Sequence, residues 1–134
     1  MFLVPKKVSS KSRLFSRKLK LSNRKNLNVS FGDYVLSFSS ASRLSNLQIG
    51  AIRSGLQRIF KKNASVWIKV LPHLAITKKP EEVRMGKGKG GIKYWVVGVK
   101  ENTALLEIKT EVKISNALFT GLRSKISTKP KVSS

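Results

Sequence analysis

The spacing of apolar side chains predicts one clear helix, over residues 45–62. The apolar positions that recur at helical spacing are Ile49, Ile52, Leu56, Ile59 and Phe60. At 100° per residue they fall within an arc about 100° wide, which is typical of a helix with one buried face. Ser45 and Gln48 stand at the spacing of an N-terminal capping box. Asn63 follows the last turn, where a left-handed residue often ends a helix.

Alternating or continuous apolar residues predict the strands. The predicted strands cover residues 29–38, 66–71, 73–77, 93–100 and 103–109. Gly32 interrupts the first of them, where we expect a bulge or a bend. Residues 39–43 are a polar connector to the helix. Only Glu101 and Asn102 separate the last two strands, which predicts a hairpin with a two-residue connection.

A second, weaker helical pattern lies near the C-terminus, over residues 114–126. Its stripe at spacings of four residues consists of Ile114, Leu118, Leu122 and Ile126. Residues 127–134 form a polar, basic tail with room for a short final strand. Two helices and about five strands predict an α+β fold, in which both helices pack on one face of a mainly antiparallel sheet. We expect residues 29–134 to form this single domain and residues 1–28 to form an arm.

The charge of the chain indicates what kind of partner it has. There are 28 lysines and arginines against 6 acidic residues, a formal net charge of +22. Such a surplus opposes compaction by self-repulsion, so we expect an anionic partner. Nucleic acid fits best, and a histone-like polycation or a protein bound to an anionic membrane surface is the alternative. The chain has no cysteine, which excludes disulfides, thiolate zinc sites and thiol catalysis. No apolar run approaches the ~20 residues of a membrane span.

Residues 1–28 contain many cations and no acidic residue. We expect an extended arm that binds RNA, with contacts from Lys6, Lys7, Lys11, Arg13, Arg17 and Lys18. The same composition is typical of a mitochondrial transit peptide or of a disordered tail. Composition alone does not separate these possibilities.

Residues 78–93, which we call the basic finger, form the other concentration of charge. Its cations are Lys78, Lys79, Arg84, Lys87, Lys89 and Lys93, and its glycines are Gly86, Gly88, Gly90 and Gly91. Glycines at this density let the backbone approach a partner closely. Residues 86–91 match G-x-G-x-x-G, but a strand follows where a dinucleotide site needs a helix, and no P-loop ending is present. The finger therefore predicts contacts to phosphate that position the protein without reading base sequence.

No arrangement of side chains indicates an enzyme, a metal site or a cofactor. His73 is the only histidine and has no evident partner ligands. Glu81 and Glu82 are adjacent in the loop, so we expect them to pair with Arg84 or nearby lysines and not to act as an acid–base pair. The aromatic residues Phe31, Trp67, Tyr94 and Trp95 lie in predicted strands and are expected mainly in the core. At most one of them, Tyr94 or Trp95, is expected at a nucleic-acid surface.

Residues 77–90, followed by Tyr94-Trp95-Val96, resemble the long and specific signature of the L-sixteen family of bacterial and organellar large-subunit ribosomal proteins. Further likenesses follow in the expected order, at residues 4–6, 29–32, 47–49 and 66–70. Gly50 and Ile52 depart from the usual helix sequence of the family, and residues 71–73 depart from its usual Phe-Pro-Asp.

The resemblance implies a structural constituent of the large ribosomal subunit that binds rRNA, lies among other ribosomal proteins and supports accommodation of A-site tRNA. Carried over by motif, the finger residues are Lys78, Lys79, Arg84, Met85, Gly86, Lys87, Gly88 and Lys89. Of these, Arg84 and Lys87 are expected to make the clearest RNA contacts. Neither a homo-oligomer nor a cofactor is implied. Residues 1–6 resemble the mature start of the family, so we expect synthesis inside an organelle, a mitochondrion before a plastid.

Overall fold

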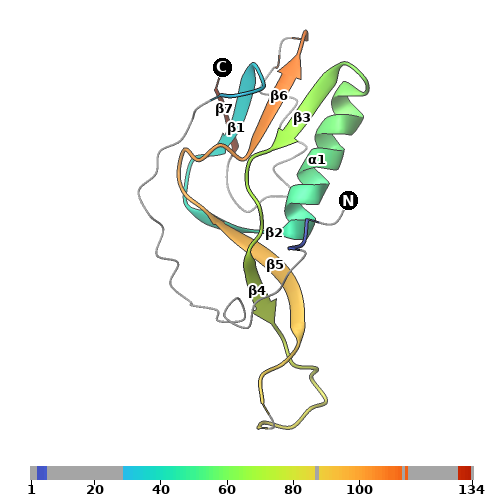
Figure 1. Cartoon of the computed structure of the whole chain (residues 1–134), viewed down its shortest axis with the longest axis vertical. Helices are drawn as coiled ribbons and strands as arrows, with labels where there is room; N and C mark the ends of the chain where they lie inside the picture. The colour runs from blue at the N-terminus through green and yellow to red at the C-terminus, as the bar shows by residue number, and fades with distance from the viewer. Residues whose placement is uncertain (1–2, 6–28, 87, 113, 115–129, 134) are drawn as a thin grey trace.

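The computed structural model describes residues 3–5, 29–86, 88–112, 114 and 130–133, and these residues form two antiparallel sheets and one helix (Figure 1). The elements in chain order are β1 (Tyr34–Phe38), β2 (Ser42–Ser45), α1 (Asn46–Phe60), β3 (Ala64–Ile68), β4 (Leu74–Thr77), β5 (Ile92–Val99), β6 (Leu106–Thr110) and β7 (Pro130–Ser133). The four-stranded sheet has the order β3-β6-β1-β7, and the three-stranded sheet has the order β2-β5-β4. The α+β class predicted from the sequence is confirmed, but the strands form two sheets and not one.

Helix α1 begins as the sequence predicts. The backbone N–H of Gln48 donates to Ser45 Oγ at 3.1 Å, and the backbone N–H of Ser45 donates to Gln48 Oε1 at 2.9 Å. These two bonds complete the capping box and satisfy backbone donors that the first turn leaves free. The prediction for the other end is wrong, because the residue with positive φ is Lys61 (φ 53°) and not Asn63. The Lys61 N–H donates to the carbonyl of Gln57 at 2.8 Å.

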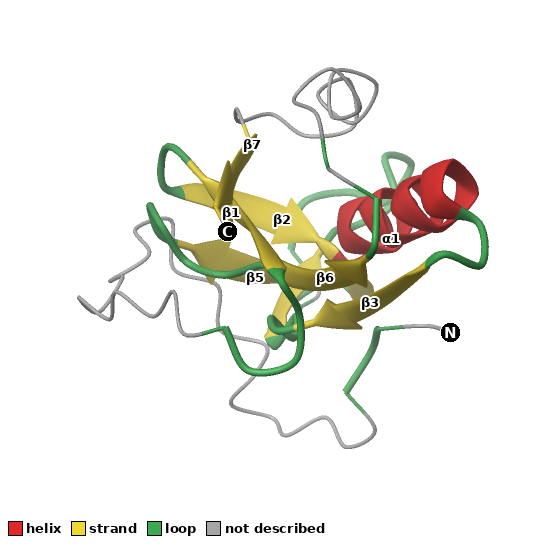
Figure 2. Cartoon of the chain, turned by 90° about the horizontal axis from the view of Figure 1, so that it is seen from above, coloured by secondary structure: helices red, strands yellow, loops and turns green. Residues whose placement is uncertain are grey.

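The apolar face of α1 packs against both sheets, and Figure 2 shows the helix on one side of them. Its buried side chains are Ile49, Ile52, Leu56 and Phe60, whereas Ile59 is partly exposed. They share one core with residues of the four-stranded sheet (Leu36, Phe38, Leu106, Ile108) and of the three-stranded sheet (Leu44, Val97, Val99). A single core therefore joins the helix to two sheets.

The predicted hairpin of residues 93–100 and 103–109 is wrong. Strand β5 pairs with β2 and β4, whereas β6 pairs with β1 and β3 in the other sheet. The segment between them crosses from one sheet to the other, with Asn102 at φ 55°. The N–H groups of Asn102 and Leu105 donate to the carbonyls of Phe38 (3.0 Å) and Leu36 (2.8 Å). Hydrogen bonds to β1 therefore fix this crossing, and not a two-residue turn.

The predicted connector and the predicted second helix also differ from the structure as described. The connector over residues 39–43 ends in strand β2, whose sequence Ser-Arg-Leu-Ser has only one apolar residue and pairs with β5. The second helix, over residues 114–126, falls almost wholly on residues 115–129, which lie outside the described part. The described residues thus contain one helix in place of two, and the short final strand is present as β7.

Candidate nucleic-acid interface

The loop of the basic finger, residues 78–91, joins β4 to β5 and extends beyond both sheets (Figure 1). The two strands pair antiparallel, with an irregularity between Ile76 and Thr77. The N–H of Lys78 donates to the carbonyl of Gly91 at 3.2 Å, which extends the pairing into the base of the loop. The loop therefore starts from a base held by backbone hydrogen bonds.

Short contacts shape the loop above its base. Lys78 Nζ lies 3.0 Å from Glu81 Oε1, which confirms that a glutamate here pairs with a nearby lysine. Lys79 Nζ donates to the carbonyl of Gly86, across the loop. The N–H of Val83 donates to the carbonyl of Pro80 at 3.4 Å. The two lysine contacts are exposed, so water competes with each of them.

Glycine is required at three positions of the finger for physical reasons. Gly86 (φ 98°) and Gly88 (φ 86°) adopt the left-handed conformation that other residues rarely take. At Gly90 an added Cβ would lie 2.7 Å from the carbonyl carbon and oxygen of Lys78. The glycines thus fix the path of the loop, and they also leave its backbone open to a partner.

The structure brings most of the predicted finger residues onto this one loop. Arg84, Met85, Gly86, Gly88 and Lys89 are exposed, Lys78 is half-exposed, and Lys79 is partly buried. Lys87 lies outside the described residues, as do the predicted arm contacts Lys6, Lys7, Lys11, Arg13, Arg17 and Lys18.

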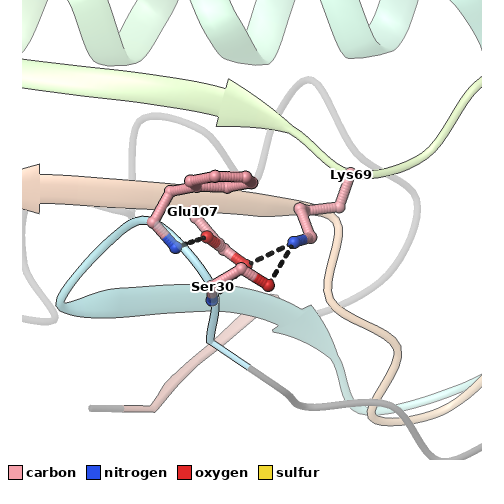
Figure 3. A network of polar contacts seen from close by, with 4 residues as sticks. Ser30, Lys69 and Glu107 are labelled. Carbon is pink, nitrogen blue, oxygen red and sulfur yellow. Dashed lines mark hydrogen bonds and ion pairs between the residues drawn. The ribbon is translucent and has the colours of Figure 1, made fainter.

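Sequence reasoning missed a buried carboxylate at the centre of the four-stranded sheet. Glu107 lies on β6 between β1 and β3, and its side chain is 0% exposed. Its Oε1 accepts from the N–H of Ser30 (3.1 Å) and its Oε2 from the N–H of Phe31 (2.7 Å). Lys69 Nζ lies 2.8 Å from Oε1 and also donates to Ser30 Oγ at 2.9 Å. Figure 3 shows these three polar side chains converging.

The environment of Glu107 keeps it ionised. Burial alone raises the pKa of a carboxyl group, but the hydrogen bond from Lys69 and those from the backbone of Phe31 and Ser30 lower it. The net pKa of Glu107 lies below its ordinary value of 4.5. One sequence signal pointed to this residue, because it interrupts the apolar run Ala104-Leu105-Leu106-Glu107-Ile108.

The contacts of Glu107 hold an aromatic cluster at the surface. The ring centroids of Phe31 and Trp67 are 6.1 Å apart with the planes tilted by 31°, and Lys69 Nζ lies 5.1 Å from the centre of the Phe31 ring. Phe31 is 62% exposed. Trp95, expected as a surface candidate, is buried, and Tyr94 is partly buried. Trp95 therefore lies in the core, where most of these aromatic residues were expected, whereas Phe31, which was expected there too, is exposed.

The described residues give no sign of a metal centre or a membrane span. They contain no group of three or more histidine, cysteine or acidic residues placed to hold a metal ion. His73 is exposed and its Nδ1 lies 3.3 Å from the carbonyl oxygen of Leu71. Helix α1, the helix in this part of the chain, is neither long nor apolar enough to cross a membrane.

Comparison with known proteins gives consistent results. Residues 5–133 match the family described as ribosomal protein L16p/L10e. The chain is similar to proteins named large ribosomal subunit protein uL16 in three bacteria. It is 42% identical over 108 residues to that of Blochmanniella pennsylvanica, covering 81% of this chain and 79% of the relative. It is 39% identical over 106 residues to that of Leptospira biflexa (79% and 77%), and 47% identical over 81 residues to that of Dichelobacter nodosus (60% and 59%).

These matches define the class of the protein: it is a structural ribosomal protein and not an enzyme. More narrowly, the chain belongs to the ribosomal protein L16p/L10e family. The resemblance drawn from residues 77–90 is thereby confirmed.

Proposed function

We propose that this protein is a constituent of the large ribosomal subunit that binds large-subunit rRNA and supports accommodation of tRNA in the A site. Its relatives carry the name of large-subunit proteins, and its net charge of +22 matches a polyanionic partner. Neighbouring ribosomal proteins complete its surroundings in this proposal.

The observation that carries the proposal is the geometry of the finger loop. A cationic loop extends from a base held by hydrogen bonds, and Arg84 is exposed on it, two residues before the first of the finger's glycines. The guanidinium group presents a planar fork of donors that fits phosphate oxygens or a guanine edge, whereas a lysine acts as a point charge. We therefore assign the main tRNA and rRNA contacts to Arg84 and Lys87, assisted by Lys78, Lys79 and Lys89.

Replacement of Arg84 tests this assignment. Ribosomes carrying Arg84→Ala should accommodate A-site tRNA roughly tenfold or more slowly, because a charge-assisted hydrogen bond contributes about 1.5–3 kcal/mol. Arg84→Lys, the matched control, keeps the charge and removes the fork, so it should fall between Arg84→Ala and wild type. The rate of tRNA accommodation is measured by rapid kinetics, and subunit assembly by sedimentation. A normal accommodation rate in Arg84→Ala ribosomes would refute the role of the finger.

The arm residues Lys6, Lys7, Lys11, Arg13, Arg17 and Lys18 belong to the same proposal, as ligands of rRNA phosphates. Each neutralised phosphate adds about −0.9 to the slope of log affinity against log salt concentration on duplex nucleic acid. Changing the six cations to Ser should therefore make that slope shallower by about 0.9 for every phosphate that the arm neutralises. An unchanged slope would show that the arm does not neutralise phosphate.

We also propose a mitochondrial location, with a plastid as the alternative. The support for this proposal is the departure of Gly50, Ile52 and residues 71–73 from the usual family sequence, since the relatives named above are bacterial. Sedimentation of the native protein with purified mitochondrial or plastid large subunits decides between the two compartments.

A further inference from the structure

The surface formed by Phe31, Trp67 and Lys69, which we call the Phe31 surface, is separate from the basic finger in sequence and in construction. Phe31 is 62% exposed, although a phenyl ring gains most free energy when it is buried. It lies outside the core that joins the helix to the two sheets. The ring instead packs against Trp67 and under the ammonium group of Lys69.

This surface is held in place by three contacts to one buried carboxylate. Glu107 accepts hydrogen bonds from the backbone N–H groups of Ser30 and Phe31 and pairs with Lys69. Every one of these contacts restrains a residue of the Phe31 surface or its immediate neighbour. A buried charge is costly unless it is fully paired, and here its pairing fixes an exposed aromatic ring. The ring is thus pre-organised, which lowers the entropy that a partner must overcome on binding.

The charge of the chain indicates which partner fits. The net charge is +22, and the segment that leads directly into Ser30 and Phe31 is the cationic stretch of residues 1–28. A polyanion bound along that stretch would therefore lie near Phe31 and Trp67. Sequence-tolerant stacking on aromatic rings is how proteins hold unpaired bases of RNA.

We propose that Phe31 and Trp67 form a stacking platform for an unpaired nucleobase of RNA, with Glu107 as the positioning residue that fixes Phe31. This inference rests on the proposed binding of large-subunit rRNA and adds a contact that is aromatic and not ionic.

Replacement of Phe31 by Leu and by Tyr tests the platform. The full-length protein is titrated with transcribed bacterial large-subunit rRNA over a series of salt concentrations. Phe31→Leu keeps an apolar side chain and removes the ring, so the affinity should fall roughly 5- to 100-fold. The slope against salt should stay at the wild-type value, because the same phosphates are still neutralised. Phe31→Tyr keeps the ring and should bind as wild type does.

A neutral effect of Phe31→Leu would overturn the platform, and this is also the result expected if another protein covers the surface. A weaker affinity with a shallower salt slope would overturn it as well, because the contact would then be ionic. If the rRNA affinity of the wild-type protein falls steeply with salt and Phe31→Leu has the same affinity, only the stacking platform is refuted. Absence of salt-dependent binding by the wild-type protein refutes the proposed function too. Thermal unfolding shows whether each variant is folded.

Discussion

Two lysine–glutamate pairs in this protein have nearly the same length and opposite surroundings. In the finger, Lys78 Nζ lies 3.0 Å from Glu81 Oε1, and the side chains are 52% and 88% exposed. Under the Phe31 surface, Lys69 Nζ lies 2.8 Å from Glu107 Oε1, and the side chains are 26% and 0% exposed. Distance alone would rank the two pairs as almost equal. Burial and the additional partners of Glu107 make the contributions of the two pairs to stability different.

The difference matches the two tasks that we propose. An exposed pair contributes about 0–1 kcal/mol, so the finger can rearrange its contacts when RNA displaces them. A buried carboxylate without its partners is strongly destabilising, so the Phe31 surface keeps one arrangement. The protein thus combines an adaptable contact with a pre-organised one.

The largest expected effect comes from Glu107→Ala. The change leaves the N–H groups of Ser30 and Phe31 and the ammonium group of Lys69 without their buried acceptor. We expect the free energy of unfolding to fall by about 2–4 kcal/mol, below the upper end for buried pairs because Lys69 can turn toward water. Urea denaturation of the purified protein measures it. A decrease below about 1 kcal/mol, the range of an exposed pair, would mean that burial does not distinguish the two pairs.

A smaller effect is expected from Gly90→Ala at the base of the finger. The new Cβ would lie 2.7 Å from backbone atoms of Lys78, so one of the two segments must move. We expect the free energy of unfolding to fall by about 1–3 kcal/mol, the usual range when side-chain atoms are forced into occupied space. Gly91→Ala is the matched control, because an added Cβ there meets nothing within 4 Å. Equal stability of the two variants would show that the base of the finger is as adaptable as its tip.

The pH dependence of stability should carry the signature of Glu107. Its pKa is lower in the folded protein than the ordinary value of 4.5, so ionisation favours folding. This contribution is fully present above pH 4.5 and is lost as the pH falls through the folded pKa, at about 1.4 kcal/mol for each unit of the difference. The stability difference between wild type and Glu107→Gln should therefore shrink in acid. The free energy of unfolding of each protein is measured from about pH 7 to about pH 3, a range that spans the ordinary pKa of a glutamate. A constant difference between wild type and Glu107→Gln over this range would contradict a lowered pKa of Glu107.

The smallest effect is expected from Glu81→Ala, which removes the exposed pair. Stability should change by less than about 1 kcal/mol, and any decrease should disappear at high salt because surface pairs are screened. Differential scanning calorimetry at low and high salt checks both points. A decrease comparable to that of Glu107→Ala would remove the contrast between the two regions.

Local signals in the sequence predicted the local parts of the fold. The spacing of Ser45 and Gln48 predicted the start of α1, because both partners of a capping box lie within one turn. The arrangement of the strands could not be predicted in this way. Strands β5 and β6 are adjacent in the chain and resemble a hairpin, yet hydrogen bonds to Phe38 and Leu36 direct them into different sheets.

The same limit applies to the candidate sites. The finger is contiguous in sequence, so its glycines and cations were visible together. The Phe31 surface brings Phe31 together with Trp67 and Lys69, and Glu107 beneath it contacts backbone groups 76 and 77 positions away. Its place within an apolar run marks Glu107 as unusual, but the run does not show which distant groups it meets. Its side chain is buried where the segment of Ser30 and Phe31 and the side chain of Lys69 fold against it.

The strand order also determines which strand pairs can form first during translation. Strand β1 pairs on one side with β6 and on the other with β7, so that Val35 faces Glu107 and Ser133. Pairing between strands so far apart in sequence is slow, because the entropy of closing the long loop is lost before the stabilising contacts form. The β4–β5 hairpin that carries the finger needs only nearby residues. A nascent chain can therefore form the β4–β5 hairpin early, whereas the pairing of β7 with β1 needs residues up to 133 to be translated.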